Sequence, residues 1–297
     1  MKALVTGAGG QLGLDVVDAF ADTEVTGLTA TDLDVGDEAA VTTAMWDLDP
    51  DVVINAAAWT DVDGCEADPI RAHRVNALGP WWLARACARH DATLVTISSD
   101  YVYGGRADGG AGEPGAGRLG WTEFDAPDPI NAYGRAKWAG EELVRQALPT
   151  HHIVRTAWLC GARGSNFVTT MLRLAREHGA VAVVDDQFGS PTFTRDLAAA
   201  LRRLAASGRY GTINLANAGQ ASWYDLAAAT FELAGVDVAL SRQSSAALQR
   251  AAPRPAWSVL DATHAAALGL GPLPDWRDGL ARLLDELGER ASPTVAG

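Results

Sequence analysis

Residues 6–13 read Thr-Gly-Ala-Gly-Gly-Gln-Leu-Gly, and this stretch decides the fold. It follows a short apolar run at the N-terminus and opens a helical pattern that covers residues 10–21. The glycines, spaced three apart from Gly7, allow a tight turn in which the backbone can approach a pyrophosphate, and the helix then offers its free N–H groups to the anion. A strand, a glycine-rich loop and a helix in this order predict a dinucleotide-binding site.

Strand-like and helix-like segments alternate over the first half of the chain. We expect short apolar strands at residues 2–6, 24–29, 51–55, 92–98 and 151–156. Helical patterns lie between them, including one at residues 37–47, for which Asp37 is a good N-cap, and one at residues 131–147. This alternation is typical of an α/β fold with a doubly wound parallel sheet.

The second half carries further helical and strand patterns. Helices are expected at residues 163–178, 194–206, 222–234 and 275–288, and strands at 181–184 and 212–215. We divide the chain into a dinucleotide-binding domain at 1–157, with returning segments near 186–222, and a smaller C-terminal α/β substrate domain that is mainly 158–297. Residues 104–129 are rich in Gly, Ala, Pro and Asp, which predicts a mobile surface loop, either a lid or a plain insertion.

Charge and cysteine content exclude several classes of protein. The formal net charge of -13 disfavours a nucleic-acid partner, because binding a phosphate backbone needs clustered cations. No run of about 18 apolar residues predicts a membrane helix, and the N-terminal run is too short for a signal peptide, so the cytoplasm is the expected location. Cys65, Cys87 and Cys160 are widely spaced, and we expect buried thiols and no metal site.

Tyr133 and Lys137 lie four residues apart in a predicted helix and so share one face. An ammonium beside a phenol is expected to lower the pKa of the tyrosine, so that its hydroxyl can exchange a proton with a substrate oxygen. The chain has 22 arginines but only two lysines, and one of them stands here. Ser99 ends the fourth predicted strand, followed by Asp100, at the edge where a doubly wound sheet binds its ligands, so Ser99 is placed to hydrogen-bond a substrate carbonyl.

The end of the second strand bears on the choice of cofactor. An acid there would bind the ribose 2′-hydroxyl of NAD, whereas an arginine would accommodate the 2′-phosphate of NADP. A strand that ends at Thr29 leaves no acid in place, a longer strand would bring in Asp32, and no arginine is near in the sequence. We favour NADPH and leave NADH open.

The glycine loop, Ser99 and the Y-x-x-x-K pair together resemble the extended short-chain dehydrogenase/reductase superfamily. Further stretches resemble the dTDP-4-dehydrorhamnose reductase family over nearly the whole chain, and the D-Q-x-G-x-P-T and R-T-x-W segments are quite specific. These stretches are Gly10-Gln11-Leu12-Gly13, Asn55-Ala56-Ala57-Ala58-Trp59-Thr60, Ser98-Ser99-Asp100-Tyr101-Val102, Arg155-Thr156-Ala157-Trp158, Asn166-Phe167, Asp186-Gln187-Phe188-Gly189-Ser190-Pro191-Thr192 and Arg254-Pro255.

This resemblance implies a Rossmann domain, a smaller domain that binds a dTDP-linked keto sugar, and hydride transfer from NADPH to C4 of dTDP-4-dehydro-L-rhamnose. It implies that Ser99, Tyr133 and Lys137 are catalytic. The cofactor contacts that it implies, together with Gly7 of the loop and the Tyr133/Lys137 pair, are Gly10, Gln11, Leu12, Asp34, Val35, Ala57, Ala58 and Thr60. The substrate contacts expected, besides Ser99 and Asp100, are Trp158, Asn166, Gln187 and Arg254.

Three other functions stay open at this point. Trp59, Gly64 and Cys160 stand where the family usually has other residues, which fits a related reductase of secondary metabolism, such as one that makes dTDP-dihydrostreptose. A nucleotide-sugar epimerase or dehydratase would use the same scaffold but keep its NAD. A non-catalytic regulatory subunit, like that of methionine adenosyltransferase, would have the same fold, and a monomer or a homodimer is expected in every case.

Overall fold

The computed structural model describes residues 1–104 and 120–291, and within them six strands form one parallel sheet. Their order is β10-β5-β4-β3-β1-β2. The bounds are β1 (Lys2–Thr6), β2 (Glu24–Leu28), β3 (Val52–Asn55), β4 (Thr93–Ser99), β5 (His151–Thr156) and β10 (Gly211–Asn214). The order reverses between β1 and β3, and the loops after these two strands diverge to leave a crevice in which such sheets bind their ligands.

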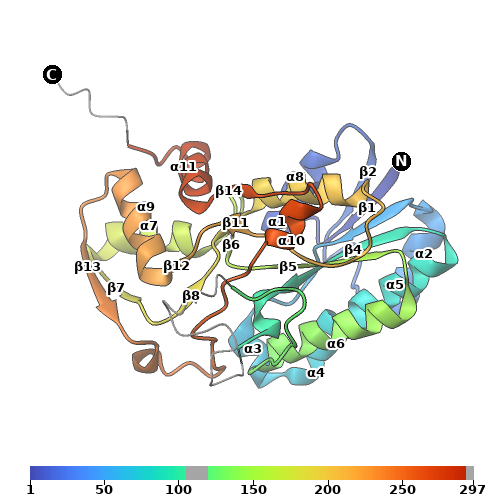
Figure 1. The fold of residues 1–297 in the computed structure, drawn as a ribbon, viewed down its shortest axis with the longest axis horizontal. Coiled ribbons are helices and arrows are strands. Elements are labelled where there is room, and N and C mark those ends of the chain that lie inside the picture. The colour runs from blue at the N-terminus through green and yellow to red at the C-terminus, as the bar shows by residue number, and fades with distance from the viewer. Residues whose placement is uncertain (105–119, 292–297) are drawn as a thin grey trace.

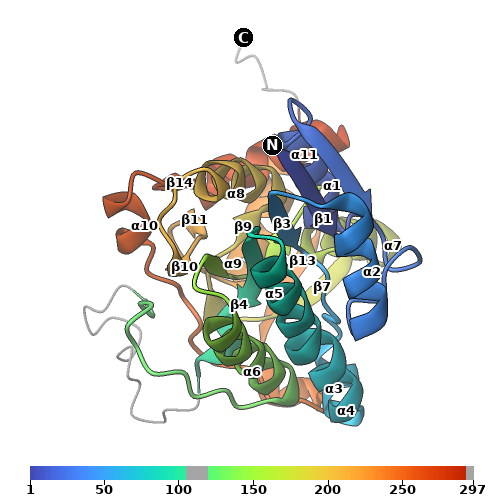
Figure 2. The ribbon, with the colours of Figure 1, turned by 90° about the vertical axis from the view of Figure 1, so that its right-hand side faces the viewer.

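Helices cover both faces of this sheet. α2 (Glu38–Leu48), α5 (Gly79–Arg89) and α6 (Ala132–Ala147) lie side by side on one face (Figure 2), and α1 (Gln11–Ala19) and α8 (Thr194–Ala205) pack together on the other. Alternate strand residues serve the two layers: Ala3 and Val5 belong to the core under α1 and α8, and Leu4 to the core under α2 and α5. The strands are therefore buried on both faces, as a parallel sheet requires.

A second region stands beside the carboxyl ends of the strands (Figure 1), with its own apolar core. It contains α7 (Phe167–His178), α9 (Trp223–Ala234), α11 (Trp276–Leu287) and the parallel pair β7 (Ala180–Val184) and β13 (Ala239–Gln243). Three short strand pairs complete it: β6 (Leu159–Cys160) with β9 (Thr192–Phe193), β8 (Phe188–Gly189) with β12 (Ala221–Ser222), and β11 (Asn217–Ala218) with β14 (Leu273–Asp275).

Short helical segments connect these elements. They are α3 (Val62–Ala67), α4 (Pro69–His73), a π-helical turn at Arg74–Leu78, α10 (Thr263–Ala267) and 3₁₀ turns at Asp100–Val102 and Ser245–Leu248. No helix in residues 1–104 and 120–291 is long and apolar enough to cross a membrane. The three cysteines are free and buried, as expected.

The expected α/β fold with a doubly wound sheet is confirmed, and each of the five strands expected in the first half forms within one residue of its predicted bounds. Asp37 caps α2 by accepting from the N–H groups of Ala39 and Ala40. The helix expected from residue 163 instead begins at Phe167, because Asn166 forms a capping box with Thr169 and so fixes the first turn.

The segment 104–129 differs from the expected mobile surface loop at its described end. Most of it, residues 105–119, lies outside the described residues. Trp121, however, is buried, stacks on Tyr103 with ring centroids 5.0 Å apart, and donates its backbone N–H to Val259. The prediction rested on the average composition of the segment, which does not show that the Trp121 side chain is buried. The division at residue 157 and the returning segments stay predictions; in the structure α8 packs on α1, and β10 pairs with β5.

Candidate active site

Two cavities lie along the carboxyl edge of the sheet and share the glycine loop. The inner cavity, of about 590 Å³, runs between the loop, the end of β4, the start of α6 and the second region. It is lined, among others, by Gly10, Gln11, Leu12, Ala58, Thr60, Ser99, Asp100, Tyr133, Lys137, Trp158 and Trp223. The outer cavity, of about 630 Å³, lies between the loops after β1, β2 and β3 and is lined by Gly7, Gly10, Thr29, Thr31, Asp34, Val35, Ala57, Ala58, Trp59, Arg71 and Arg74, among others.

Ser99, Tyr133 and Lys137 meet in the inner cavity from two elements. Ser99 is the last residue of β4, and the other two stand one turn apart near the start of α6, whose first turn is capped by Asn131. Lys137 is buried and donates from Nζ to the carbonyl of Ile97 at 3.0 Å, while Nζ lies 5.9 Å from the centroid of the Tyr133 ring. The backbone of β4 thus holds the ammonium beneath the phenol.

The pKa of Tyr133 moves opposite to the expected direction. Burial raises it well above the ordinary value, a hydrogen bond with Ser99 lowers it only in part, and the charge of Asp100 raises it further. Burial, the largest cause, outweighs the lowering that the nearby Lys137 ammonium is expected to give. The phenol therefore carries its proton at neutral pH, as a proton donor must.

Asp100 is also buried beside Ser99. Its Oδ1 accepts from the Ser99 hydroxyl at 2.9 Å, while its Oδ2 has no hydrogen-bond partner among the described residues. Burial raises the pKa of Asp100 to about 7. The Asp100 carboxyl thus lies at the cavity beside Ser99, and the hydroxyls of Ser258 and Ser99 oppose the effect of burial on its pKa.

The glycine loop has the shape that a dinucleotide requires. Gly7 has φ 70°, and a Cβ on it would lie 2.6 Å from the backbone N of Ala57, so the loops after β1 and β3 touch there. A Cβ on Gly13 would overlap the carbonyl of Gly7. Gly10 caps α1 without a side chain, which leaves the helix N-terminus open to an anion. These residues fit a pyrophosphate-linked cofactor.

The outer cavity shows which charged groups surround the end of β2. The strand β2 ends at Leu28, and the carboxylate of Asp32 folds back on Thr29, accepting from its N–H at 2.9 Å and from its hydroxyl. The Asp32 carboxylate is therefore engaged within its own turn, and Asp34 is the acid that lines the cavity. Two arginines that were not predicted from the sequence also line this cavity: Arg71 from α4 and Arg74 from the turn after it. Arg74 pairs with Asp34 at 2.7 Å, and the Arg71 guanidinium lies 4.3 Å from the centroid of the Trp59 ring.

Two tryptophans form the far wall of the inner cavity. Trp158 follows β5, and Trp223 is the first residue of α9. Their rings stack with centroids 3.4 Å apart and planes within 5°. Trp158 has φ 47°, which is strained for a bulky side chain, and a Cβ on Gly189 would overlap its ring. The fold therefore fixes the Trp158 indole at the cavity.

The sequence of the chain is similar to that of known reductases along nearly its whole length. A family model described as RmlD substrate binding domain matches residues 1–289. The chain is 43% identical over 303 residues to a dTDP-4-dehydrorhamnose reductase of Streptomyces griseus, which covers 99% of this chain and 96% of that protein. The chain belongs to the dTDP-4-dehydrorhamnose reductase family.

Other members of the dTDP-4-dehydrorhamnose reductase family extend this likeness. A solved dTDP-4-dehydrorhamnose reductase of Bacillus anthracis, in complex with NADP, matches with a TM-score of 0.90 and 34% identity, over 96% of this chain and 100% of that one. A Streptomyces antibioticus protein named probable dTDP-4,6-dihydroxy-2-methyloxan-3-one 4-ketoreductase is 41% identical over 306 residues, covering 100% of this chain and 99% of that protein.

Three residues that the family resemblance suggested as substrate contacts do not line either cavity. Asn166 caps α7 and donates to Gln11 and to the carbonyl of Gly161. Arg254 pairs through both terminal nitrogens with Asp63, at 2.7 and 2.9 Å. Gln187 lies half-buried between β7 and β8. Their roles toward a substrate stay predictions.

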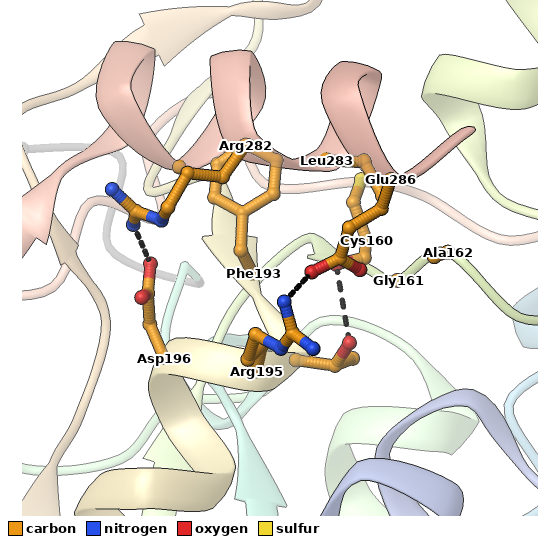
Figure 3. Close-up of a pocket in the computed structure, with 11 residues that line it drawn as sticks. Cys160, Gly161, Ala162, Phe193, Arg195, Asp196, Arg282, Leu283 and Glu286 are labelled. Carbon is orange, nitrogen blue, oxygen red and sulfur yellow. Dashed lines mark hydrogen bonds and ion pairs between the residues drawn. The ribbon is translucent and has the colours of Figure 1, made fainter. Parts of the chain in front are cut away.

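A separate hollow lies under α11 (Figure 3), away from Ser99, Tyr133 and Lys137. Its volume of about 20 Å³ admits roughly one water molecule. Its charged rim is paired internally, Arg195 with Glu286 and Arg282 with Asp196. This hollow is a seam between α8 and α11. Nowhere in residues 1–104 and 120–291 do three or more His, Cys, Asp or Glu residues gather as a metal site would require.

Proposed function

We propose that this chain is an NADPH-dependent reductase of the C4 keto group of a dTDP-4-dehydro-6-deoxy sugar, converting dTDP-4-dehydro-L-rhamnose to dTDP-L-rhamnose. One observation carries the proposal: the buried Tyr133 phenol stands with Ser99 and Lys137 in a cavity that runs from the glycine loop to Trp158. NADH stays open as an alternative donor. Ser99, Tyr133 and Lys137 are the residues we assign to catalysis.

The chain's own groups divide the work of the reaction. A bound nicotinamide cofactor would supply the hydride to the keto carbon. On substrate binding the Ser99 hydroxyl, which donates to Asp100 Oδ1 in this structure, turns to donate to the carbonyl oxygen and polarises it, and the Tyr133 hydroxyl gives its proton to the alkoxide that forms there. The positive charge of Lys137 beneath the ring favours the phenolate that remains, because an opposite charge nearby stabilises the ionised form.

The same cavity supports recognition of a deoxy sugar. The Trp158 and Trp223 indoles offer an apolar surface to ring C–H groups and a methyl group, and the Asp100 carboxyl lines the same cavity beside Ser99. At the other end, Asp34, Val35 and Ala57 would hold the adenosine half of the cofactor in the outer cavity. Arg71 and Arg74 bring positive charge to that half, which suits a 2′-phosphate.

A second candidate is reduction of another dTDP-keto sugar. The Streptomyces antibioticus relative matches along its whole length and is named for a different keto sugar. Both candidates use the same chemistry and differ only in the sugar that fits against Trp158. An epimerase would retain its NAD through each turnover, and the reactive set Ser99, Tyr133 and Lys137 argues against a purely regulatory subunit.

One incubation tests the proposal. The purified protein is mixed with NADPH and, separately, with each of several dTDP-4-keto-6-deoxy sugars, nicotinamide absorbance is followed, and the product is identified by NMR. We expect oxidation of NADPH with dTDP-4-dehydro-L-rhamnose and a C4 alcohol as product. Turnover of a different keto sugar would support the second candidate, and no NADPH oxidation with any of them would refute both. A cytoplasmic location and a monomeric or homodimeric state stay predictions.

A further inference from the structure

A buried carboxylate lies one helical turn beyond Lys137 and takes no part in the reaction described above. Glu141 is 2% exposed and, like Lys137, belongs to α6. Residues four apart on a helix are neighbours on one face, so the two side chains lie on the same side of α6, toward the sheet. A carboxylate is rarely buried without a partner, so its contacts should show what it is for.

Glu141 is held by three hydrogen-bond donors from three elements. Its Oε1 accepts from the Ser98 hydroxyl of β4 at 2.5 Å and from Arg155 Nε of β5 at 2.9 Å. Its Oε2 accepts from Arg155 at 2.6 Å and from Arg145 at 2.7 Å. Burial would raise the pKa of Glu141, but the Arg155 guanidinium outweighs burial and holds that pKa below its usual value. The carboxylate is therefore ionised and fixed in place.

The surroundings of Lys137 contain few other charges. Its Nζ contacts the Ile97 carbonyl of β4 and lies under the Tyr133 ring of its own helix, and the Cys65 thiol approaches from α3. Among the residues that the structure describes, no carboxylate is in direct ion-pair contact with Nζ, and Glu141 has the larger effect on its charge, ahead of the Cys65 thiol. Burial lowers the pKa of Lys137 to about 8, and the charge of Glu141 opposes that fall.

We propose that Glu141 is a positioning residue: its buried carboxylate, fixed by Ser98 and Arg155, keeps Lys137 as the ammonium ion beneath Tyr133. The part that concerns the charge of Lys137 stands on the i,i+4 placement of the two buried side chains on α6 and on the hydrogen bonds that fix Glu141. The part that concerns turnover rests on the proposed function. A merely structural Glu141 would join α6 to β4 and β5 but would leave the titration of Lys137 unchanged.

The lysine content of the chain gives a direct test. Only Lys2 and Lys137 are present, so protein labelled with ¹³C at lysine Cε gives two resonances, and exposed Lys2 serves as an internal reference. The pH titration of Lys137 is compared between the wild type and Glu141→Gln. Since an adjacent negative charge favours the ammonium form, its removal should lower the titration midpoint of Lys137 by about 1 pH unit or more. Glu142→Gln, one residue away and half-exposed, is the matched control and should leave the midpoint in place.

Two outcomes separate this proposal from a structural role. A folded Glu141→Gln protein whose Lys137 titrates at the wild-type midpoint would overturn it. If the single variant does not fold because Arg155 is left unpaired, Glu141→Gln/Arg155→Gln is compared with Arg155→Gln, so that only the carboxylate charge differs, and the lower midpoint is expected in the double variant. Equal midpoints in these two variants overturn the proposal.

Measurements of reductase activity then test the role of Glu141 separately from the proposed function of the chain. The ammonium is lost as pH rises through the pKa of Lys137, so Glu141→Gln should move the loss of kcat at high pH to a lower pH, by the amount that the NMR titration gives. Wild-type protein without reductase activity would refute the proposed function and leave the NMR result to decide the role of Glu141. An active wild type with an unmoved Lys137 midpoint would refute only the role of Glu141.

Discussion

The two walls of the inner cavity differ in the chemical character of their side chains, one polar and charged, the other aromatic. One wall consists of β4 and α6 and presents Ser99, Tyr133 and Lys137, behind which Glu141 and Arg155 form a buried ion pair. The opposite wall, from the second region, presents Trp158 and Trp223 as a stack without a charged group between the rings. Proton transfer needs groups whose charge and orientation are fixed, whereas a sugar ring needs area and shape.

Because of this difference, substitutions in the two walls should affect different properties of the protein. The polar wall depends on buried charges that must stay paired, so a change there should cost both stability and turnover. The aromatic wall depends on apolar contact, so a change there should weaken substrate binding and leave the chemical step largely intact. Four substitutions, from the largest expected effect to the smallest, test whether the walls are as separate as the structure implies.

Arg155→Met should have the largest effect, on stability. The guanidinium is almost fully buried, and its loss leaves Glu141 with a buried charge that Arg145 and Ser98 only partly compensate. We expect a loss of about 3–5 kcal/mol in the free energy of unfolding, measured by urea titration. Arg145→Met, which removes a more exposed partner of the same carboxylate, should cost clearly less. Equal losses for the two variants would contradict the view that burial decides the cost.

Tyr133→Phe should remove the proton donor and leave the wall otherwise intact. We expect kcat to fall by about 10²-fold or more, roughly 2.7 kcal/mol, with the Kd for NADPH within about twofold of the wild type. Steady-state kinetics and fluorescence titration of NADPH measure the two quantities. Tyr210→Phe, at a half-exposed position away from the cavity, is the control. Near-normal turnover of the Tyr133 variant would remove this residue from the mechanism.

Trp158→Ala tests the aromatic wall. Loss of the indole should raise the KM for the sugar nucleotide by about tenfold, roughly 1.4 kcal/mol, while kcat changes far less. The control is Trp46→Ala, since Trp46 is exposed on α2. A fall in kcat as large as that of Tyr133→Phe, with KM unchanged, would show that the two walls do not act separately.

Trp223→Leu should give the smallest effect, because Trp223 supports Trp158 through one stacked contact. An aromatic pair contributes about 0.5–1.5 kcal/mol, so we expect KM to rise about threefold. Trp223→Phe restores an aromatic ring and should bring KM most of the way back. The support role would be ruled out by an equal rise in KM for both variants.

The local signals in the sequence were sufficient for the sheet and the reactive set. Apolar runs and the glycine loop placed β1 to β5, and the spacing of Tyr133 and Lys137 put both on one helix face, where the structure has them. Ser99 reached the cavity because strand ends meet at one edge of a parallel sheet. Each of these predictions depends on residues close together in the chain or on a general rule of the fold.

The sequence could not give contacts between distant segments. Arg74 pairs with Asp34, which lies 40 residues earlier, and no sequence motif links the two positions. The same holds for Trp223, 65 residues after Trp158. The direction of the Tyr133 pKa was wrong for a related reason: i,i+4 spacing places Lys137 near the phenol but does not show how deeply distant segments bury the ring, and burial is the largest cause of the raised pKa.

The side chain of Gln11 has a kinetic consequence. Its amide nitrogen donates to the carbonyl of Ser165, and its oxygen accepts from the N–H of Gly161 and from Asn166, so a residue of the glycine loop is tied to the segment that leads from Trp158 into α7. A cofactor bound at the glycine loop should therefore also fix the position of the segment that follows Trp158 and leads into α7. We expect the two ligands to add in a compulsory order, dinucleotide first, and the oxidised dinucleotide to leave last.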